Sequence, residues 1–584
     1  MKPQVCVLLA HVALIEAINV IVFLPGTWDF ERKVLNRVAQ EMAFRNHGTA
    51  TFKAVIIPEQ RYLVRHRLHL VRELALKTGS PESVYGPLKR VGNAVPWRAE
   101  YDLTDFALPY WRAYSNSCID LINSDIMDRM KKDKYDVAVV YSGNPCHLAL
   151  VYAVNLPFIY FDLAGLSDET ALAAGIPTLP SYIPSSSSIY TQHMTLAQRW
   201  HNLWLIAKEY AAFSGMPWLA SALNARYREM DRAVSRAFQQ DYEIKKLHPH
   251  FPDVNEIKRD AALYFINSDP ALEFAGRPTM PNVVYVGGLH VEYPKPLFDP
   301  YNTTIAKYDG IIVFSMGTTA NSSAMPQHMR RTIIDTLGRF QRHLVFMRVD
   351  SVPNITIEDI PGNINFSLYL PQNDLLADKK ASLLITNGGM NSIMEAVHHG
   401  IPVLGIPLYG PNYHNLRKVE AKGFGIILDK NNLNPKSLHH AINELLNNPK
   451  YKSAAKSISR AFKDRPMTAL ETALYWIEYI GRNHGAAHLR PAVHQLYLFQ
   501  YLLLDVFTIV IVGTYLICKT LQWFMARLFS KSDMRLAVSA EKGVKAEKSS
   551  HLSSNGHAAP SPKSVNEPEK PTNVNKRKKT PKID

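Results

Sequence analysis

Paired glycines with polar neighbours stand in the segment Thr-Asn-Gly-Gly-Met-Asn-Ser at 386–392, between an apolar run and a helical pattern. Glycine lets a backbone approach a ligand closely, and the free N–H groups and dipole of a helix N-terminus attract a phosphate. These residue types also form an ordinary tight turn with a polar cap, and that alternative stays open on composition alone. The candidates for a diphosphate-binding turn are Asn387, Gly388, Gly389, Asn391 and Ser392.

Two other stretches carry residues suited to a nucleotide. Phe-Ser-Met-Gly-Thr at 314–318 is a small-residue turn after an apolar run, and it contains Ser315 and Gly317. Tyr369 precedes Leu-Pro-Gln, which ends at Gln372. An aromatic ring can stack on a planar base while a glutamine bonds the edge of that base, although alone this stretch is an ordinary loop.

Short apolar runs that alternate with helical patterns must position these residues. Continuous apolar strands separated by helices indicate parallel sheets buried on both faces, and ligands of such sheets bind beyond the carboxyl ends of the strands. We therefore predict two doubly wound α/β domains that face each other. The predicted strands are 18–24, 51–57, 136–141, 158–161, 310–315, 343–347, 381–386, 402–407 and 425–428, with helices around 33–44 and 329–339.

Both ends of the chain indicate a membrane protein. Residues 1–17 have a lysine before an apolar run and fit a secretory signal peptide, although a buried first strand is the alternative. Residues 496–524 contain an apolar stretch long enough to span a bilayer, with Asp505 close to one interface. A buried core helix is the alternative for this stretch.

The last segment, 525–584, has 13 Lys and Arg against 6 Asp and Glu. Its polar composition predicts a disordered tail, and basic residues directly after a spanning helix mark the cytoplasmic side. Its basic residues act most simply as a determinant of membrane topology or as a contact with acidic lipid.

Composition limits the remaining classes. The 584 residues carry a net charge of +15 and 47% hydrophobic residues, which excludes a single small core and global disorder. Four cysteines exclude a disulfide scaffold, and Cys118 and Cys146 could form at most one luminal bridge. Nucleic-acid binding is not expected, because much of the excess charge lies in the tail.

Residues 370–407 combine Leu-Pro-Gln-Asn-Asp-Leu-Leu, Thr-Asn-Gly-Gly-Met-Asn-Ser and Gly-Ile-Pro-Val-Leu-Gly-Ile-Pro. This string resembles the signature of UDP-glycosyltransferases, specifically the animal UDP-glucuronosyltransferase group. The resemblance implies a GT-B fold with two Rossmann-like domains. Residues 18–290 would bind the acceptor, and residues 291–490 would bind the UDP-sugar.

The resemblance also gives roles to single residues. Tyr369 stands where the family has a Trp that stacks on uracil, and Gln372 matches the Gln that contacts base or ribose. Glu395 matches the Glu that bonds the ribose hydroxyls. The residues that match or fall near the diphosphate-contacting positions are Ser315, Gly317, Arg348, Gly389, Asn391 and Ser392. Asn387 replaces a His, and Pro411-Asn412 replaces the Asp-Gln that holds the sugar hydroxyls.

The family uses a catalytic pair of a His and an Asp, and this chain has other residue types at both positions. An inverting transfer needs a base to take the proton of the acceptor hydroxyl. Where the family has its His, this chain has Glu31, with Asp29 as the other candidate; the Asp position falls on Tyr141. Either a carboxylate with a raised pKa is the base, or the site has been lost or repurposed.

The sequence thus predicts a membrane-bound transferase of the endoplasmic reticulum that moves a hexose or glucuronic acid from a UDP-sugar to a small lipophilic acceptor. It needs no cofactor and no metal, and it can associate with itself or with related transferases. Two alternatives remain. One is an impaired relative that binds nucleotide and regulates active transferases, and the other is a scaffold that acts through its basic tail.

Overall fold

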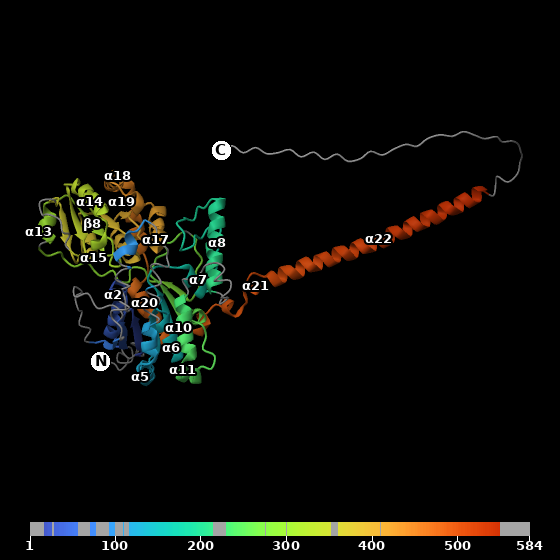
Figure 1. Cartoon of the computed structure of the whole chain (residues 1–584), viewed down its shortest axis with the longest axis horizontal. Helices are drawn as coiled ribbons and strands as arrows, with labels where there is room; N and C mark the ends of the chain where they lie inside the picture. The colour runs from blue at the N-terminus through green and yellow to red at the C-terminus, as the bar shows by residue number, and fades with distance from the viewer. Residues whose placement is uncertain are drawn as a thin grey trace, which may run out of the picture. The chain divides into compact units, whose positions relative to one another are not determined.

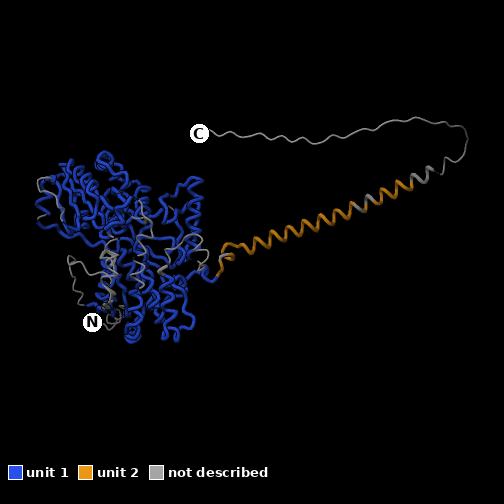
Figure 2. Tube along the Cα trace, viewed as in Figure 1, with its two compact units in different colours: residues 1–495 blue, residues 496–584 orange. Residues whose placement is uncertain are grey.

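The structure is a computed structural model of the whole chain. It forms two compact units, residues 1–495 and residues 496–584 (Figure 2). The residues that it describes are 17–25, 29–55, 70–77, 91, 93–99, 109, 116–213, 229–274, 276–299, 301–351, 360–408 and 410–548. The predicted signal peptide at 1–17 lies, apart from its last residue, outside this described part.

The first unit contains two parallel sheets, each in its own lobe (Figure 1). The sheet of the first lobe has seven strands in the order β3-β2-β1-β4-β5-β6-β7, and that of the second has six in the order β10-β9-β8-β11-β12-β13. All pairs are parallel. The strands of the first lobe are β1 (Asn19–Leu24), β2 (Gly48–Val55), β3 (Arg72–Lys77), β4 (Val137–Tyr141), β5 (Phe158–Asp162), β6 (Leu263–Ile266) and β7 (Val283–Tyr285). Those of the second are β8 (Gly310–Ser315), β9 (His343–Arg348), β10 (Ile364–Ser367), β11 (Ala381–Thr386), β12 (Val403–Gly405) and β13 (Gly425–Ile427).

Helices cover both faces of each sheet, which is why the central strands are apolar on both sides. One face of the first sheet packs on α6 (Pro145–Ala153), α10 (Glu229–Gln240) and α12 (Val254–Arg259), and the other packs on α2 (Asp29–Phe44). The second sheet lies between α14 (Gln327–Gly338) with α18 (Pro435–Asn447) and α16 (Met390–His399) with α19 (Pro449–Lys463). Further α-helices among the described residues of this unit are α5 (Ile126–Asp133), α7 (Asp168–Ala173), α8 (Leu196–Phe213), α11 (Tyr242–Leu247), α13 (Tyr301–Ala306), α15 (Gln372–Ala377), α17 (Gly410–Ala421) and α20 (Ala469–Arg482).

The last helix of the unit, α20, belongs to the core of the first lobe and not to that of the second. Ala469, Ala473, Leu474, Ile477 and Ile480 are buried there together with residues of β1 and α2. The predicted 291–490 domain is therefore not a continuous lobe, because its last helix crosses back. The spacing of these residues shows that one helix face is buried, but it does not show which sheet that face covers.

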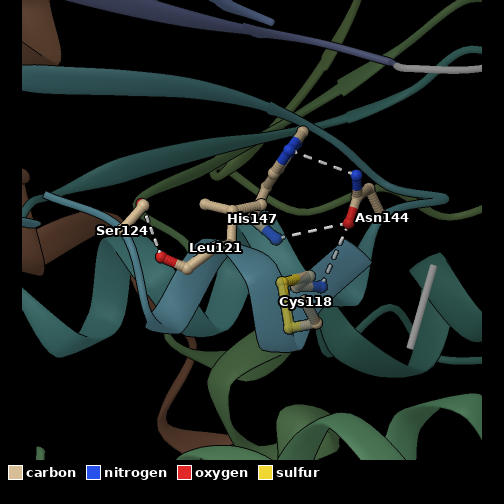
Figure 3. The surroundings of a disulfide bond; sticks show 6 residues. Cys118, Leu121, Ser124, Asn144 and His147 are labelled. Atoms are coloured by element: carbon tan, nitrogen blue, oxygen red, sulfur yellow. Dashed lines mark hydrogen bonds between the residues drawn. A yellow bond between two sulfur atoms is a disulfide. The ribbon is translucent and has the colours of Figure 1, made fainter. Parts of the chain in front are cut away.

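A disulfide bond joins Cys118 to Cys146 at the carboxyl end of β4 (Figure 3). Asn144 caps the helix α6 there, and its side-chain oxygen accepts from the backbone N–H groups of Cys146 and His147. The bond connects the helical residues 116–122 to the first turn of α6. A disulfide of this kind persists in an oxidising compartment.

The second unit contains α21 (Leu498–Tyr501) and the 45-residue helix α22 (Leu504–Lys548). Helix α22 is long and apolar enough to cross a membrane. It continues past the predicted end of the span at 524, so the prediction of a disordered tail from 525 is wrong for residues 525–548. That stretch is rich in Ala, Lys, Glu and Met, which favour helix independently of burial.

A buried ion pair joins the two lobes of the first unit. Lys418 of α17 donates from Nζ to Glu273 Oε1 at 2.7 Å, and both side chains are buried. Burial by itself raises the pKa of Glu273, but the charges of Lys418 and Arg277 outweigh it and lower that pKa to about 2. The carboxylate is therefore charged at neutral pH and depends on Lys418 as its partner.

We predict that Lys418→Met destabilises the protein by about 3–5 kcal/mol, because it leaves a buried carboxylate without its partner. Chemical denaturation followed by circular dichroism measures this change. Replacing both partners, in Lys418→Met with Glu273→Met, should cost less than the single change.

The neighbouring pair of Arg417 and Glu420 provides a matched control, because its side chains are 31% and 40% exposed. Arg417→Met should change the free energy of unfolding by only about 0–1 kcal/mol. Equal losses in Lys418→Met and Arg417→Met would contradict the assignment of a stabilising contact between the lobes.

Candidate functional site

Two of the predicted loops, those after β8 and β11, lie beside Arg348 at the carboxyl edge of the second sheet, because β9, β8 and β11 are neighbours in it. Ser315 ends β8 and is buried, and Gly317 in the loop has a φ of +74°. Arg348, at the end of β9, donates from Nη1 to the Gly317 carbonyl at 2.5 Å and from Nη2 to Asp350 at 2.8 Å. The side chain of Arg348 therefore fixes the backbone of the loop that follows β8.

The turn between β11 and α16 requires its first glycine. Gly388 has a φ of +94°, and a Cβ there would lie 2.6 Å from the side chain of Leu416. Its carbonyl accepts from Asn415 Nδ2 at 3.3 Å. Asn387 is buried, and its Oδ1 accepts from the backbone N–H of Gly389 at 3.2 Å.

Helix α16 begins at Met390, and Gly389 in front of it supplies no side-chain cap. The amide of Asn387 lies 3.2 Å from where a Cβ on Gly317 would stand, so the β8 and β11 loops touch. A helix start beside two glycine loops offers backbone N–H groups and a positive dipole end to an anion.

Gln372, Ser392 and Glu395 form a hydrogen-bonded cluster between the starts of α15 and α16. Gln372 Nε2 donates to Glu395 Oε2 at 2.7 Å and to Ser392 Oγ at 3.1 Å. Burial raises the pKa of Glu395, and the charge of Lys33 and the bond from Gln372 act against that rise. A buried carboxylate fixed in this way can accept hydrogen bonds from ligand hydroxyls.

Tyr369 stands two residues before Pro371, and its side chain is 53% exposed. Partial burial raises the pKa of its hydroxyl, so the ring is neutral at physiological pH. Its backbone carbonyl accepts from Tyr301 Oη at 3.5 Å. The exposed aromatic ring, close in the chain to Gln372, suits the stacking of a planar base.

Asn391 connects this site to the first lobe, which the sequence did not predict. Asn267 Nδ2 donates to Asn391 Oδ1 at 2.8 Å, and His290 Nε2 lies 3.1 Å from the Asn391 carbonyl. His290 Nε2 is also 3.7 Å from Glu395 Oε1. Burial, with the charges of Lys33 and Arg37, lowers the pKa of His290 to about 3, so its ring is neutral.

The two predicted catalytic carboxylates belong to the first turn of α2. Asp29 and Glu31 have helical backbone there, and their side chains lie outside the part that the structure describes. Tyr141 ends β4, which pairs with β1 in the register Phe23 with Val140. The end of β4 is therefore next to the end of β1, from which the chain continues towards α2.

A tyrosine at the end of β4 cannot orient a base as a carboxylate does.

Among the described residues, no group of three or more His, Cys, Asp and Glu is placed to hold a metal ion.

Solved structures share this fold. A complex of a UDP-glucosyltransferase from Polygonum tinctorium covers 80% of this chain and 99% of its own, with a TM-score of 0.52 and 16% identity. The calicheamicin glycosyltransferase CalG4 has the same TM-score and coverage at 13% identity. The two lobes thus have the predicted GT-B fold.

Curated relatives are more similar in sequence. The human 2-hydroxyacylsphingosine 1-beta-galactosyltransferase is 30% identical over 423 residues, which cover 72% of this chain and 73% of the relative. The UDP-glucuronosyltransferase 2C1 of Oryctolagus cuniculus is 31% identical over 420 residues, with coverage of 70% and 78%. A model of the family "UDP-glucoronosyl and UDP-glucosyl transferase" matches residues 97–535. The chain therefore belongs to this family of UDP-sugar-dependent transferases, as its sequence resemblance predicts.

Proposed function

We propose that this protein is a membrane-anchored inverting glycosyltransferase that moves a hexose or glucuronic acid from a UDP-sugar to a small lipophilic acceptor. The observation that carries the proposal is the bond from Gln372 to the buried Glu395, beside the glycine turn at the start of α16. This arrangement offers an acceptor for ribose hydroxyls next to donors for a diphosphate.

The donor would lie across the three loops of the second lobe. Its uracil would stack on Tyr369 and its ribose would bond Glu395, with Gln372 holding the carboxylate in place. The diphosphate would bind the backbone N–H groups around Gly317 and Gly389. Asn387 can donate one hydrogen bond to a phosphate but carries no charge.

The transfer needs a base in the first lobe. Asp29 or Glu31 would take the proton of the acceptor hydroxyl while its oxygen attacks the anomeric carbon. The new C–O bond then forms as the bond from the anomeric carbon to the phosphate oxygen breaks, and UDP leaves with the electron pair. A carboxylate does this well only if its surroundings raise its pKa above the ordinary value near 4.

The sugar stays open between the two types that the relatives' names give. One relative is a galactosyltransferase and another a glucuronosyltransferase. An anchor at α22 suits acceptors that partition into lipid, and we place the protein in the endoplasmic reticulum membrane with its first unit in the lumen. Association with itself or with related transferases is a further part of this proposal.

We predict that Glu395→Gln weakens the binding of UDP-glucose by about 10- to 100-fold, because hydrogen bonds to a charged group contribute about 1.5–3 kcal/mol. The raised pKa of Glu395 gives this contact a pH dependence. As the pH falls through that pKa, the carboxylate gains a proton, loses acceptor capacity, and binds the donor less tightly.

Calorimetric titration of the detergent-solubilised full chain at several pH values measures both effects. The pH dependence should disappear in Glu395→Gln and persist in Glu243→Gln, a change on the exposed surface of α11. Unchanged affinity in Glu395→Gln would reject the ribose contact.

A second prediction concerns the base. Replacing the true base by alanine should reduce turnover by about 100-fold or more, the usual contribution of general-base catalysis, while the affinity for UDP stays the same. Asp29→Ala and Glu31→Ala are compared for this purpose. Glu41→Ala, near the other end of α2, is the control.

The second candidate function is regulation of active relatives by a protein that binds nucleotide but transfers no sugar. Tyr141 at the place of the family's Asp is the observation that favours it. UDP binding without turnover across a broad panel of acceptors would support this candidate and argue against both carboxylates as the base.

A further inference from the structure

Helix α8 exposes a stripe of large apolar side chains, which we call the α8 stripe. Its members are spaced by four, three and one residues, so they share one helix face. Trp200 and Trp204 are 68% and 52% exposed. Among the described residues of the first unit, the other tryptophans are buried Trp97 and half-buried Trp476. The stripe consists of Leu196, Trp200, Leu203 and Trp204.

A different face of α8 holds the helix to the protein. Asn202 is buried, and its Oδ1 accepts from the backbone N–H of Ser185 at 2.7 Å. Its Nδ2 donates to the carbonyls of Pro180 and Ile183, both at 2.8 Å. Ile206 is also buried. The contacts of Asn202 and Ile206 therefore hold α8 in one orientation, and the side chains of the α8 stripe stay outside the core.

The stripe and the end of the first unit are both attached to helix α7. Helices α7 and α8 are in contact (Figure 1). Ser185 Oγ donates to Asp168 of α7 at 2.6 Å. Directly after α7, a Cβ on Gly175 would meet the side chains of Val493 at 2.7 Å and Pro491 at 2.8 Å. The last residues of the first unit therefore lie beside the end of α7, the helix on which α8 packs.

Helix α22 begins at Leu504, and eight residues, 496–503, separate it from Gln495 at the end of the first unit. A linker of eight residues spans at most about 28 Å when fully extended. If α22 crosses a bilayer, this linker limits how far the end of the first unit can lie from the membrane surface.

We propose that the α8 stripe docks on the lipid surface of the membrane that α22 spans. Tryptophan prefers the interface between hydrocarbon and headgroups, because its ring is apolar and its N–H finds a polar partner there. Leu196 and Leu203 add apolar area, and exposed Arg199 lies beside the stripe, where it can meet lipid phosphate. This contact would keep the first lobe, the proposed acceptor lobe, at the lipid surface.

The inference goes beyond the donor site and rests only on the proposed membrane span of α22. Flotation of the full chain with phosphatidylcholine liposomes checks that span first. The environment-sensitive fluorophore NBD is then attached at position 204 through Trp204→Cys. Cys6 and Cys518 are replaced by serine, which leaves Cys118 and Cys146 in their disulfide bond.

The matched control carries the same probe at position 436 through Lys436→Cys, an exposed site in the first turn of α18. In liposomes with brominated acyl chains, we expect the emission maximum of the probe at 204 to shift to shorter wavelengths. We also expect its emission intensity to fall, because the lipid bromine atoms quench it. The probe at 436 should do neither.

Two outcomes would overturn the proposal. Spectra at 204 that equal those at 436 would mean that the stripe faces water. If the emission at 204 shifts to the blue without lipid quenching, and this shift grows with protein concentration, a second copy of the chain covers the stripe. UDP binding by the same labelled proteins is measured in parallel, so that a failure here is distinguished from a failure of the donor site.

Discussion

A few polar contacts between the two lobes fix residues of the proposed nucleotide site. Asn267 and His290 from the first lobe bond Asn391 at the start of α16, and Lys418 pairs with Glu273. Asn267, His290, Lys418 and Glu273 are buried and Asn391 is half-buried, so separating the lobes would leave polar atoms without partners unless water enters. The geometry of the proposed donor-binding loops is therefore linked to the arrangement of the lobes.

The site has little positive charge of its own for a substrate that carries a diphosphate. Asn387 is neutral, His290 is neutral because its pKa is about 3, and Arg348 is bonded to Gly317 and Asp350. Lys33 of the first lobe is the cation whose charge acts on both Glu395 and His290. Backbone N–H groups and the start of α16 would therefore have to contribute much of the attraction for the diphosphate.

Much of the fold could be predicted because its signals are local. Strands such as β8 and β11 are continuous apolar runs, and the glycine turns that follow them place the donor loops at one edge of the sheet. Strand β3 was missed because its sequence, Arg-Glu-Leu-Ala-Leu-Lys, is charged at both ends and lies at the edge of the sheet. The short strands β6, β7 and β10 were not predicted either.

Features that depend on distant parts of the chain were not predictable from local patterns. Three contacts of this kind join residues far apart in sequence. Asn267 and His290 bond Asn391, α20 packs in the core of the first lobe, and Pro491 packs on Gly175. The roles of Asp29 and Glu31 stay predictions, since only their backbone is described.

The measurement that tests the donor site most directly is hydrogen–deuterium exchange of the full chain with and without UDP-glucose. If the proposed site is correct, the ligand will slow exchange at the backbone N–H groups of 316–318 and 388–392 and leave strand β2 unchanged. Equal exchange in these two loops with saturating ligand, or protection only elsewhere, would contradict the assignment of the nucleotide site.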